Sequence, residues 1–251
     1  MSNTSLTEHF AHYFELVVAN TPQLKREVFS IRYQVYCQEL NYEPPSNFPD
    51  GLETDEYDIR SIHYLLKHRS SGIYAGCVRV VLPELDNPAA IFPSEKACSR
   101  HFDLISRPRS DFCEISRLAV LSRFRRRKGE QKIPEGIIYF SENQLDNSLN
   151  RRSFPIIALS LYWACIGTGP SLNLDVLALM EPRLARHFRH YGIISQQIGE
   201  LVEHRGKRGF FIIKPNEFRN SIKAEVKELF DFIDAEREKQ CGKNSKNGNP
   251  K

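Results

Sequence analysis

Short apolar stretches recur along the chain and predict a β-sheet. They are brief and rich in Val, Ile, Leu, Phe and Tyr, as strands are. Some alternate polar and apolar residues, and others are apolar almost throughout. Strands are therefore expected at residues 13–19, 61–68, 73–82, 113–120, 172–179 and 209–215.

Helical spacing of apolar residues separates these strands. Thr21 and Pro22 form a helix start, with Thr as the N-cap and Pro in the first turn, and the apolar positions continue to Val35. The apolar run at 154–167 predicts a buried helix that extends to about residue 166. A shorter helix at 181–192 has Pro182 and Gly192 as its start and stop signals, and a last helix is expected at 220–238, with Ile222, Val226, Leu229 and Ile233 on one face.

The order of these elements defines a fold class. Strands mixed with helices in one series favour a single domain with a mixed sheet and helices on both faces, an α+β fold with three α/β/α layers. The domain is expected to span residues 1–219, followed by a C-terminal packing helix at 220–238. Residues 239–251 are polar, rich in Lys, Asn and Gly, and offer nothing to bury, so a disordered tail is expected there.

Composition narrows the class of protein. The chain has 251 residues, 41% of them hydrophobic, and a net charge of only +4, which permits an acidic partner without requiring one. Its six cysteines form no C-x-x-C pair, and the N-terminus shows no secretory signal, so a cytoplasmic protein is expected. The run at 154–167 is shorter than the ~20 residues that a membrane span requires. No membrane span is expected.

Charged residues interrupt two of the predicted strands. Arg79 lies in the strand at 73–82. In the strand at 113–120, Glu114 and Ser116 share one face, and Arg117 points to the other face unless the strand is bulged. Buried charges are costly unless they are paired, and the acidic stretch ETDEYD at 53–58 offers partners. Two interpretations stay open: an ion-pair network that fixes a loop to the sheet, or a polar functional site. A calcium loop is disfavoured because its acidic spacing is absent.

Three other groups are open to a functional and a structural interpretation. Arg32 lies at the edge of its helix's apolar stripe and, taken alone, predicts a surface arginine with a packed stem. The basic segment 123–132 fits a solvated turn, a nucleic-acid surface or, because it follows a strand, a phosphate-binding turn. His187 and His190 lack a third ligand, so no metal site is expected.

Together these residues resemble a known constellation. The series Arg32, Tyr36, Glu53, Asp55, Asp58, Arg79, Glu114, Ser116 and Arg117 resembles the acyl-homoserine-lactone (autoinducer) synthases, bacterial enzymes with the GNAT N-acyltransferase fold. The resemblance covers about residues 13–213. It is closer to the PEP-CTERM/exosortase system-associated acyltransferases, a family related to those synthases and to long-chain N-acyl amino acid synthases, in five stretches: 50–72, 78–84, 114–130, 178–193 and 199–213.

The resemblance implies a GNAT acyl-CoA N-acyltransferase fold with a mixed, splayed central sheet flanked by helices. It also implies an enzyme that moves a fatty acyl group from a thioester donor to the amine of a small acceptor, such as an amino acid. Glu114 would be the general base, with Ser116 and Arg117 beside it. A charged substrate-binding cluster would contain Arg32, Tyr36, Asp55, Asp58, Arg79. The donor's phosphopantetheine arm would contact Val120, Leu121, Arg125, Arg126, Arg127, Lys128, Gly129.

Departures from the family pattern bear on the two substrates. The tryptophan typical of the lactone synthases is absent, with Tyr42 nearby, and residues 79–84 read RVVLPE, so adenosylmethionine is disfavoured as acceptor. Gly129 is the one clear glycine of the coenzyme A signature. Acyl carrier protein, which is acidic, is therefore favoured over coenzyme A as donor, docking on Arg123 to Lys128.

The expected partners are thus a carrier protein and a small amine, with no nucleic acid, metal or permanently bound cofactor. Two other functions stay open on the same fold: a non-catalytic module that binds acyl thioesters or lipids, and an autoinducer-type lactone synthase. Glu114 and the acidic stretch favour an enzyme, because a binding module would not need them.

Overall fold

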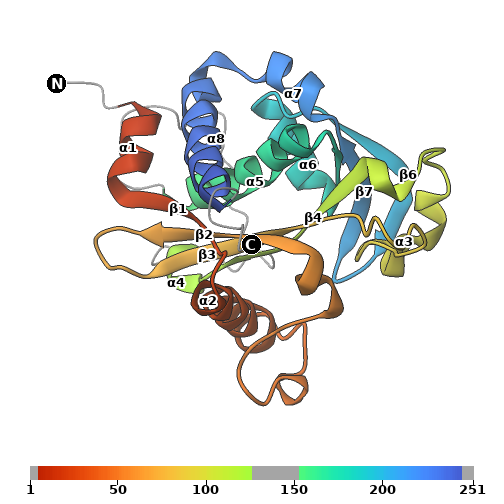
Figure 1. Ribbon diagram of the computed structural model, residues 1–251, viewed down its shortest axis with the longest axis horizontal. Coiled ribbons are helices and arrows are strands. Elements are labelled where there is room, and N and C mark those ends of the chain that lie inside the picture. The colour runs from red at the N-terminus through yellow and green to blue at the C-terminus, as the bar shows by residue number, and fades with distance from the viewer. Residues whose placement is uncertain (1–4, 126–152, 245–251) are drawn as a thin grey trace, which may run out of the picture.

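A seven-stranded mixed sheet runs through the protein (Figure 1). The computed structural model describes residues 5–125 and 153–244. The strand order is β1-β2-β3-β4-β5-β7-β6, and every neighbouring pair is antiparallel except β4 and β5, which are parallel. The strands are β1 Phe14–Val18, β2 Ser61–His68, β3 Tyr74–Val81, β4 Phe112–Val120, β5 Asp175–Met180, β6 Ser195–Glu203 and β7 Lys207–Ile213.

Helices cover both faces of the sheet, which confirms the three-layer α+β fold. Figure 1 shows α2 on one face and α1, α5, α6, α7 and α8 on the other. The helices are α1 Leu6–Tyr13, α2 Pro22–Arg32, α3 Glu95–Phe102, α4 Ser122–Arg125, α5 Ser153–Leu172, α6 Pro182–His190, α7 Pro215–Ser221 and α8 Ala224–Asn244. A π-helix η1 (Tyr33–Glu39) continues α2, and short 3₁₀ turns are η2 Pro45–Asn47, η3 Glu56–Arg60 and η4 Arg109–Asp111.

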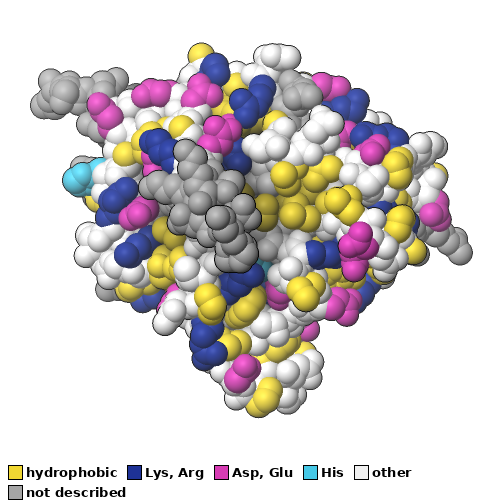
Figure 2. Space-filling model, viewed as in Figure 1, with side chains coloured by type: hydrophobic (Ala, Val, Ile, Leu, Met, Phe, Trp, Pro, Cys, Tyr) yellow, Lys and Arg dark blue, Asp and Glu magenta, His cyan; other side chains and the backbone are white. Residues whose placement is uncertain are grey.

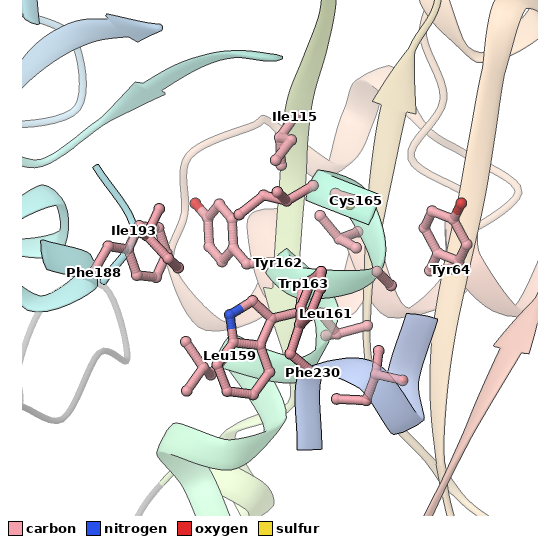
Figure 3. Close-up of a cluster of buried hydrophobic side chains, with 14 of the residues drawn as sticks. Tyr64, Ile115, Leu159, Leu161, Tyr162, Trp163, Cys165, Phe188, Ile193 and Phe230 are labelled. Atoms are coloured by element: carbon pink, nitrogen blue, oxygen red, sulfur yellow. The ribbon is translucent and has the colours of Figure 1, made fainter. Parts of the chain in front are cut away.

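The main core lies between the sheet and α5, as the apolar run at 154–167 predicts. Trp163 and Leu161 have no exposed surface, and they belong to one buried cluster with Phe230 of α8 and Ile115 of β4 (Figure 3). Burial of such side chains contributes about 1.5–3 kcal/mol each. The face of β4 that carries Ile115 is thereby committed to the core, and its other face is left for the polar residues.

β4 and β5 pair over only part of their length. Their register runs from Phe112–Asp175 to Ile115–Ala178, whereas β4 continues to Val120. The two strands therefore separate after Ile115, and the backbone of β4 beyond that point has no ladder partner from β5. The expected splayed sheet is confirmed.

A bulge in β4 decides the direction of Arg117. Arg79 pairs with Ser116 and Cys77 with Ala119, so two residues of β4, Arg117 and Leu118, lie opposite one residue of β3. Arg117 has a φ of 55°, which is uncommon for a residue other than glycine. The bulge turns Arg117 toward the face that also carries Ser116. Glu114 and Arg117 therefore do not point to opposite faces, as they would on a regular strand.

The C-terminal boundary differs from the prediction. The helix does not begin at residue 220: Ile222 is an extended link between α7 and α8. α8 then continues to Asn244, six residues past the expected end at 238. The Gln240 amide donates to the Leu16 carbonyl (2.8 Å) and accepts from the Val18 N–H (2.9 Å), so it satisfies the free edge of β1. The expected start of a disordered tail at residue 239 is therefore wrong, and residues 245–251 lie outside the described part.

Candidate active site

Three segments bring a buried ionic cluster together on the α2 face of the sheet. Arg32 comes from α2, Arg79 from β3, and the acidic residues from the stretch at 53–58. Arg32 Nη1 and Arg79 Nη1 both donate to Asp58 Oδ1 at 2.6 Å, and Arg79 Nη2 donates to Asp55 Oδ2 at 2.8 Å. Both arginines are fully buried, and their burial is tolerable because they are paired. The expectation that Asp55 and Asp58 pair with arginines is confirmed, whereas Arg32 is not a surface residue.

The acidic stretch folds into a turn that aims its carboxylates. Asp55 caps the 3₁₀ turn η3: its Oδ1 accepts from the Tyr57 N–H at 3.0 Å. In return, the Asp55 N–H donates to Asp58 Oδ2 at 2.8 Å. Each carboxylate therefore satisfies the turn with one contact and an arginine with another, so the turn and the cluster depend on each other.

Glu53 belongs to the series that resembles the synthases, but it is absent from the expected charged cluster; the structure makes it a member of that cluster. It is 1% exposed and pairs with Nε of Arg32, and its Oε1 accepts from Arg117 Nε at 3.1 Å. Arg117 Nη2 also lies 3.2 Å from Asp55 Oδ2. The Tyr36 ring lies under the Arg117 guanidinium, and its hydroxyl donates to the Leu118 carbonyl at 2.7 Å. Glu53 was visible as the first acidic residue of ETDEYD.

The pKa values follow from this pairing. Burial alone would raise the pKa of Asp58, but the charges of Arg32 and Arg79 lower it to about 2. The pKa values of Glu53 and Asp55 are lowered for the same reason, so the cluster is fully ionised at neutral pH. His63 lies beside it, with Nε2 at 3.7 Å from Asp58 Oδ1, and burial lowers its pKa to about 4. His63 is therefore neutral.

Glu114 lies on β4, the strand of Arg117, but it is not part of the ionic cluster. It is 2% exposed, and its carboxylate accepts from Ser94 through the N–H at 3.1 Å and the hydroxyl at 2.6 Å. Burial raises its pKa to about 7 although these hydrogen bonds favour the ionised form. In the described part of the chain, Ser94 is the hydrogen-bond partner of the Glu114 carboxylate, and it is Glu53 that pairs with Arg32 and Arg117. A carboxyl group with a pKa near 7 can accept and release a proton at neutral pH.

The residues expected to bind the donor are only partly described. The side chains of Val120 and Leu121 are buried in two apolar cores, and the Leu121 N–H donates to the Ala75 carbonyl at 3.0 Å, so neither side chain faces a donor. Arg125 is also buried, and its Nη2 bonds to Glu39, whose Oε1 accepts from the Ser122 N–H at 3.2 Å. Arg125 thus ties α4 to Glu39 of η1, contrary to the expectation that it faces a donor. Arg126, Arg127, Lys128 and Gly129 lie outside the described residues.

Two further properties concern ligands and membranes. Within residues 5–125 and 153–244, no group of three or more His, Cys, Asp or Glu side chains is placed to hold a metal ion. In the same ranges, no helix combines the length and apolar character needed to cross a bilayer.

Comparison with known proteins shows which proteins this chain is similar to. Residues 31–134 match the family model described as an acetyltransferase (GNAT) domain. An acyl-homoserine-lactone synthase from Vibrio anguillarum is 36% identical over 73 residues, which is 29% of this chain and 35% of that synthase. The chain therefore spans about a third of the length of the curated relative that it matches.

Solved structures extend the similarity of fold to most of the chain. The lactone synthase LasI superposes with a TM-score of 0.56 at 13% identity, covering 85% of this chain and 98% of LasI. TofI, in a ternary complex with an inhibitor and MTA, gives 0.56 at 17% identity, covering 87% and 96%. FeeM, an N-acyl amino acid synthase from uncultured soil microbes, gives 0.52 at 11% identity, covering 83% and 94%.

These findings define the class. The chain has the GNAT acyltransferase fold, and the part that matches the GNAT family model, residues 31–134, contains the ionic cluster and β4. Over 73 residues the chain is also similar to an acyl-homoserine-lactone synthase.

Proposed function

We propose that the protein is an N-acyltransferase that moves a fatty acyl group from a thioester donor to the amine of a small acceptor, such as an amino acid. The observation that carries this proposal is that three functional features lie together on β4. Glu114, Ser116 and Arg117 occupy one face at the place where β4 separates from β5. A titratable carboxyl, an ionic cluster and a stretch of β4 that no longer pairs with β5 therefore lie close together.

The chemistry follows from what each group can do. An amine must lose a proton to attack a thioester, and a carboxylate with a pKa near 7 can take that proton. Because Glu114 is buried against Ser94, the proton reaches it through water or through the Ser94 hydroxyl. The amine nitrogen then forms the new C–N bond, the C–S bond breaks, and the thiolate leaves and is protonated. Backbone N–H groups of β4 beyond Ile115 would stabilise the oxyanion.

The donor is either acyl carrier protein or coenzyme A. The basic sequence at 123–128 favours the acidic carrier protein, and Arg123 is exposed at its start. One structure with the same fold is described as that of a CoA-dependent lactone synthase, BjaI, with SAM and isopentyl-CoA, which keeps coenzyme A as the second donor to test. The finer resemblance to the PEP-CTERM/exosortase system-associated acyltransferases stays a proposal that rests on the sequence motifs.

The surface offers little support for nucleic-acid binding. On the face drawn in Figure 2, Lys and Arg side chains lie among Asp and Glu side chains instead of forming one basic surface. An extended run of phosphates is bound by positive charge concentrated on one face. This distribution fits a protein that recognises a small or locally charged partner.

A direct assay tests the proposal. The purified protein is incubated with dodecanoyl-carrier protein or dodecanoyl-coenzyme A, together with each amino acid and with adenosylmethionine, and the products are identified by mass spectrometry. We expect an N-dodecanoyl amino acid and an equal amount of free thiol. Binding of the thioester without any acylated amine would instead identify a non-catalytic module. An acyl-homoserine lactone would identify an autoinducer synthase.

A further inference from the structure

Two arginines at the edge of the ionic cluster remain accessible. Arg32 and Arg79 are enclosed, whereas the side chains of Arg117 and Arg205 keep 21% and 26% of their surface exposed. Arg205 lies in the turn between β6 and β7, where its φ of 53° and that of Gly206 at 98° form the tight hairpin end. This hairpin belongs to the half of the sheet beyond the β4–β5 opening (Figure 1).

One carboxylate oxygen already lies between these two arginines. Glu43, in the segment after η1, accepts a hydrogen bond from Arg205 Nη2 through its Oε1. The same Oε1 lies 4.0 Å from Arg117 Nη2. The separation of the two guanidinium groups therefore suits a carboxylate that contacts both.

Stacked tyrosines hold the two guanidinium groups in place. Arg117 lies over the Tyr36 ring at 5.6 Å, and Arg205 lies over the Tyr42 ring at 5.2 Å. The two rings are stacked, with centroids 6.3 Å apart and planes inclined by 24°. A guanidinium held over an aromatic face loses less freedom when its N–H edge binds an anion.

We propose that Arg117 and Arg205 form the subsite for the carboxylate of the acceptor, so that the acceptor class is amino acids with a free carboxylate. This inference rests on the proposed function. In the described ranges, Arg205 makes a single hydrogen bond, to Glu43, which leaves Nε and Nη1 as donors. Arg117 directly follows Ser116 at the point where β4 leaves β5. A carboxylate bound there holds the amine of an amino acid near the splayed strand.

The enclosed arginines cannot serve in this way. Arg32 and Arg79 are buried behind Glu53, Asp55 and Asp58, and reaching them would break the cluster. Arginine is fully charged at any physiological pH and presents paired N–H donors that match a carboxylate. An acceptor with an uncharged amide in place of the carboxylate would form no ion pair with Arg205, which would then pair with Glu43 alone. Such an acceptor would bind more weakly.

Direct binding tests the subsite independently of turnover. The two probes are N-dodecanoylglycine and its carboxamide, N-dodecanoylglycinamide, titrated calorimetrically into the wild type, Arg205→Gln, Arg205→Lys and the control Arg26→Gln, whose arginine is exposed on α2. We expect the wild type and the control to bind the carboxylate at least ~10-fold more tightly than the amide. We expect Arg205→Gln to lose that preference, with unchanged affinity for the amide, and Arg205→Lys to recover part of it.

Two results would overturn the subsite: equal affinity of the wild type for the two probes, or a preference that survives in Arg205→Gln. Failure of the proposed function has a different signature. A protein that prefers the carboxylate probe but acylates no amine would retain the subsite and lose the assigned reaction.

Discussion

The Arg79 guanidinium donates to both carboxylate oxygens of Asp55, with Nη2 at 2.8 Å from Oδ2 and Nη1 bonded to Oδ1. This two-pronged pair joins a central strand to the turn η3, and Arg79 Nε adds a bond to Ser116 Oγ at 2.9 Å. One side chain therefore fixes the acidic turn to the strand that carries Glu114. Stability and activity are expected to respond together when the cluster is broken.

The first prediction concerns the buried carboxylate that two arginines share. Asp58→Ala leaves Arg32 and Arg79 each short of a partner, and breaking a buried ion pair in this way costs about 3–5 kcal/mol of the free energy of unfolding. Chemical denaturation measures the loss. The matched control is Glu56→Gln, which removes an exposed carboxylate of the same turn whose ion pair is with the exposed Lys96. Equal stability of the two variants would show that the cluster is not a structural unit.

The second prediction concerns acid stability through His63. Burial lowers the pKa of His63 to about 4, so the unfolded chain takes up a proton below pH 6.5 that the folded chain refuses until about pH 4. The free energy of unfolding should therefore fall as the pH decreases through this window. His63→Phe removes that contribution and should flatten the slope, which denaturation between pH 4 and 7 measures.

Glu114 acts in the opposite direction over an overlapping range. Its raised pKa of about 7 means that the folded chain keeps a proton that the unfolded chain loses above about pH 4.5, so stability from this group falls as the pH rises. For this reason the slopes of His63→Phe and of the wild type have to be compared with each other. Identical slopes in both proteins would contradict a neutral, buried His63.

The third prediction separates docking from anchoring in the basic segment. Arg123 is exposed, whereas Arg125 is buried beside Glu39. Reversal of Arg123, Arg126 and Arg127 to Glu should weaken binding of acyl carrier protein without loss of stability, and wild-type affinity should fall as salt rises. Arg125→Glu should instead lower the thermal midpoint, because it places a second carboxylate beside Glu39. Full activity of the triple variant with acyl carrier protein at low salt would favour coenzyme A as donor.

Capping residues and apolar spacing predict the helices whose ends depend on neighbouring residues in the sequence. Thr21 caps α2, with its hydroxyl accepting from the Leu24 N–H at 3.2 Å, and Gly192 ends the α6 segment with a φ of 89°. The helix α1 also had a signal, because Ser5 and Glu8 form a capping box, but it was not recognised. β6 gave no signal, since most of its side chains are exposed on an edge strand and show no apolar alternation.

The site depended on contacts that spacing does not encode. The spacing around Arg32 predicts a surface residue. Its burial depends on the carboxylate of Glu53, which lies 21 residues later in the sequence and pairs with it. The direction of Arg117 required the bulge, which shows only in the register of β3 with β4. Ser94 could not be predicted as the partner of Glu114, because a loop brings it there from outside any predicted element. The sequence could therefore supply the charged residues of the site, but not which of them pair with each other.

The pH dependence of the transfer rate reports on Glu114 itself. A general base acts in its ionised form, so the wild-type rate should rise with pH with a midpoint near 7, set by the raised pKa of Glu114. The acceptor amine titrates identically in both proteins, so the difference between the wild-type and Glu114→Gln profiles isolates this group. The fold of Glu114→Gln should be intact at pH 8, because the variant removes a charge that burial disfavours.

The rate of N-dodecanoyl amino acid formation by Glu114→Gln, measured beside the wild type with the same donor and acceptor, is the most direct test. Wild-type protein should form the product, and the folded variant should form it ~10²–10⁴-fold more slowly, the usual contribution of a general base, without the rise near pH 7. A folded variant that matches the wild-type rate, or a wild type that releases no acylated amine, would contradict acyl transfer at this site of β4.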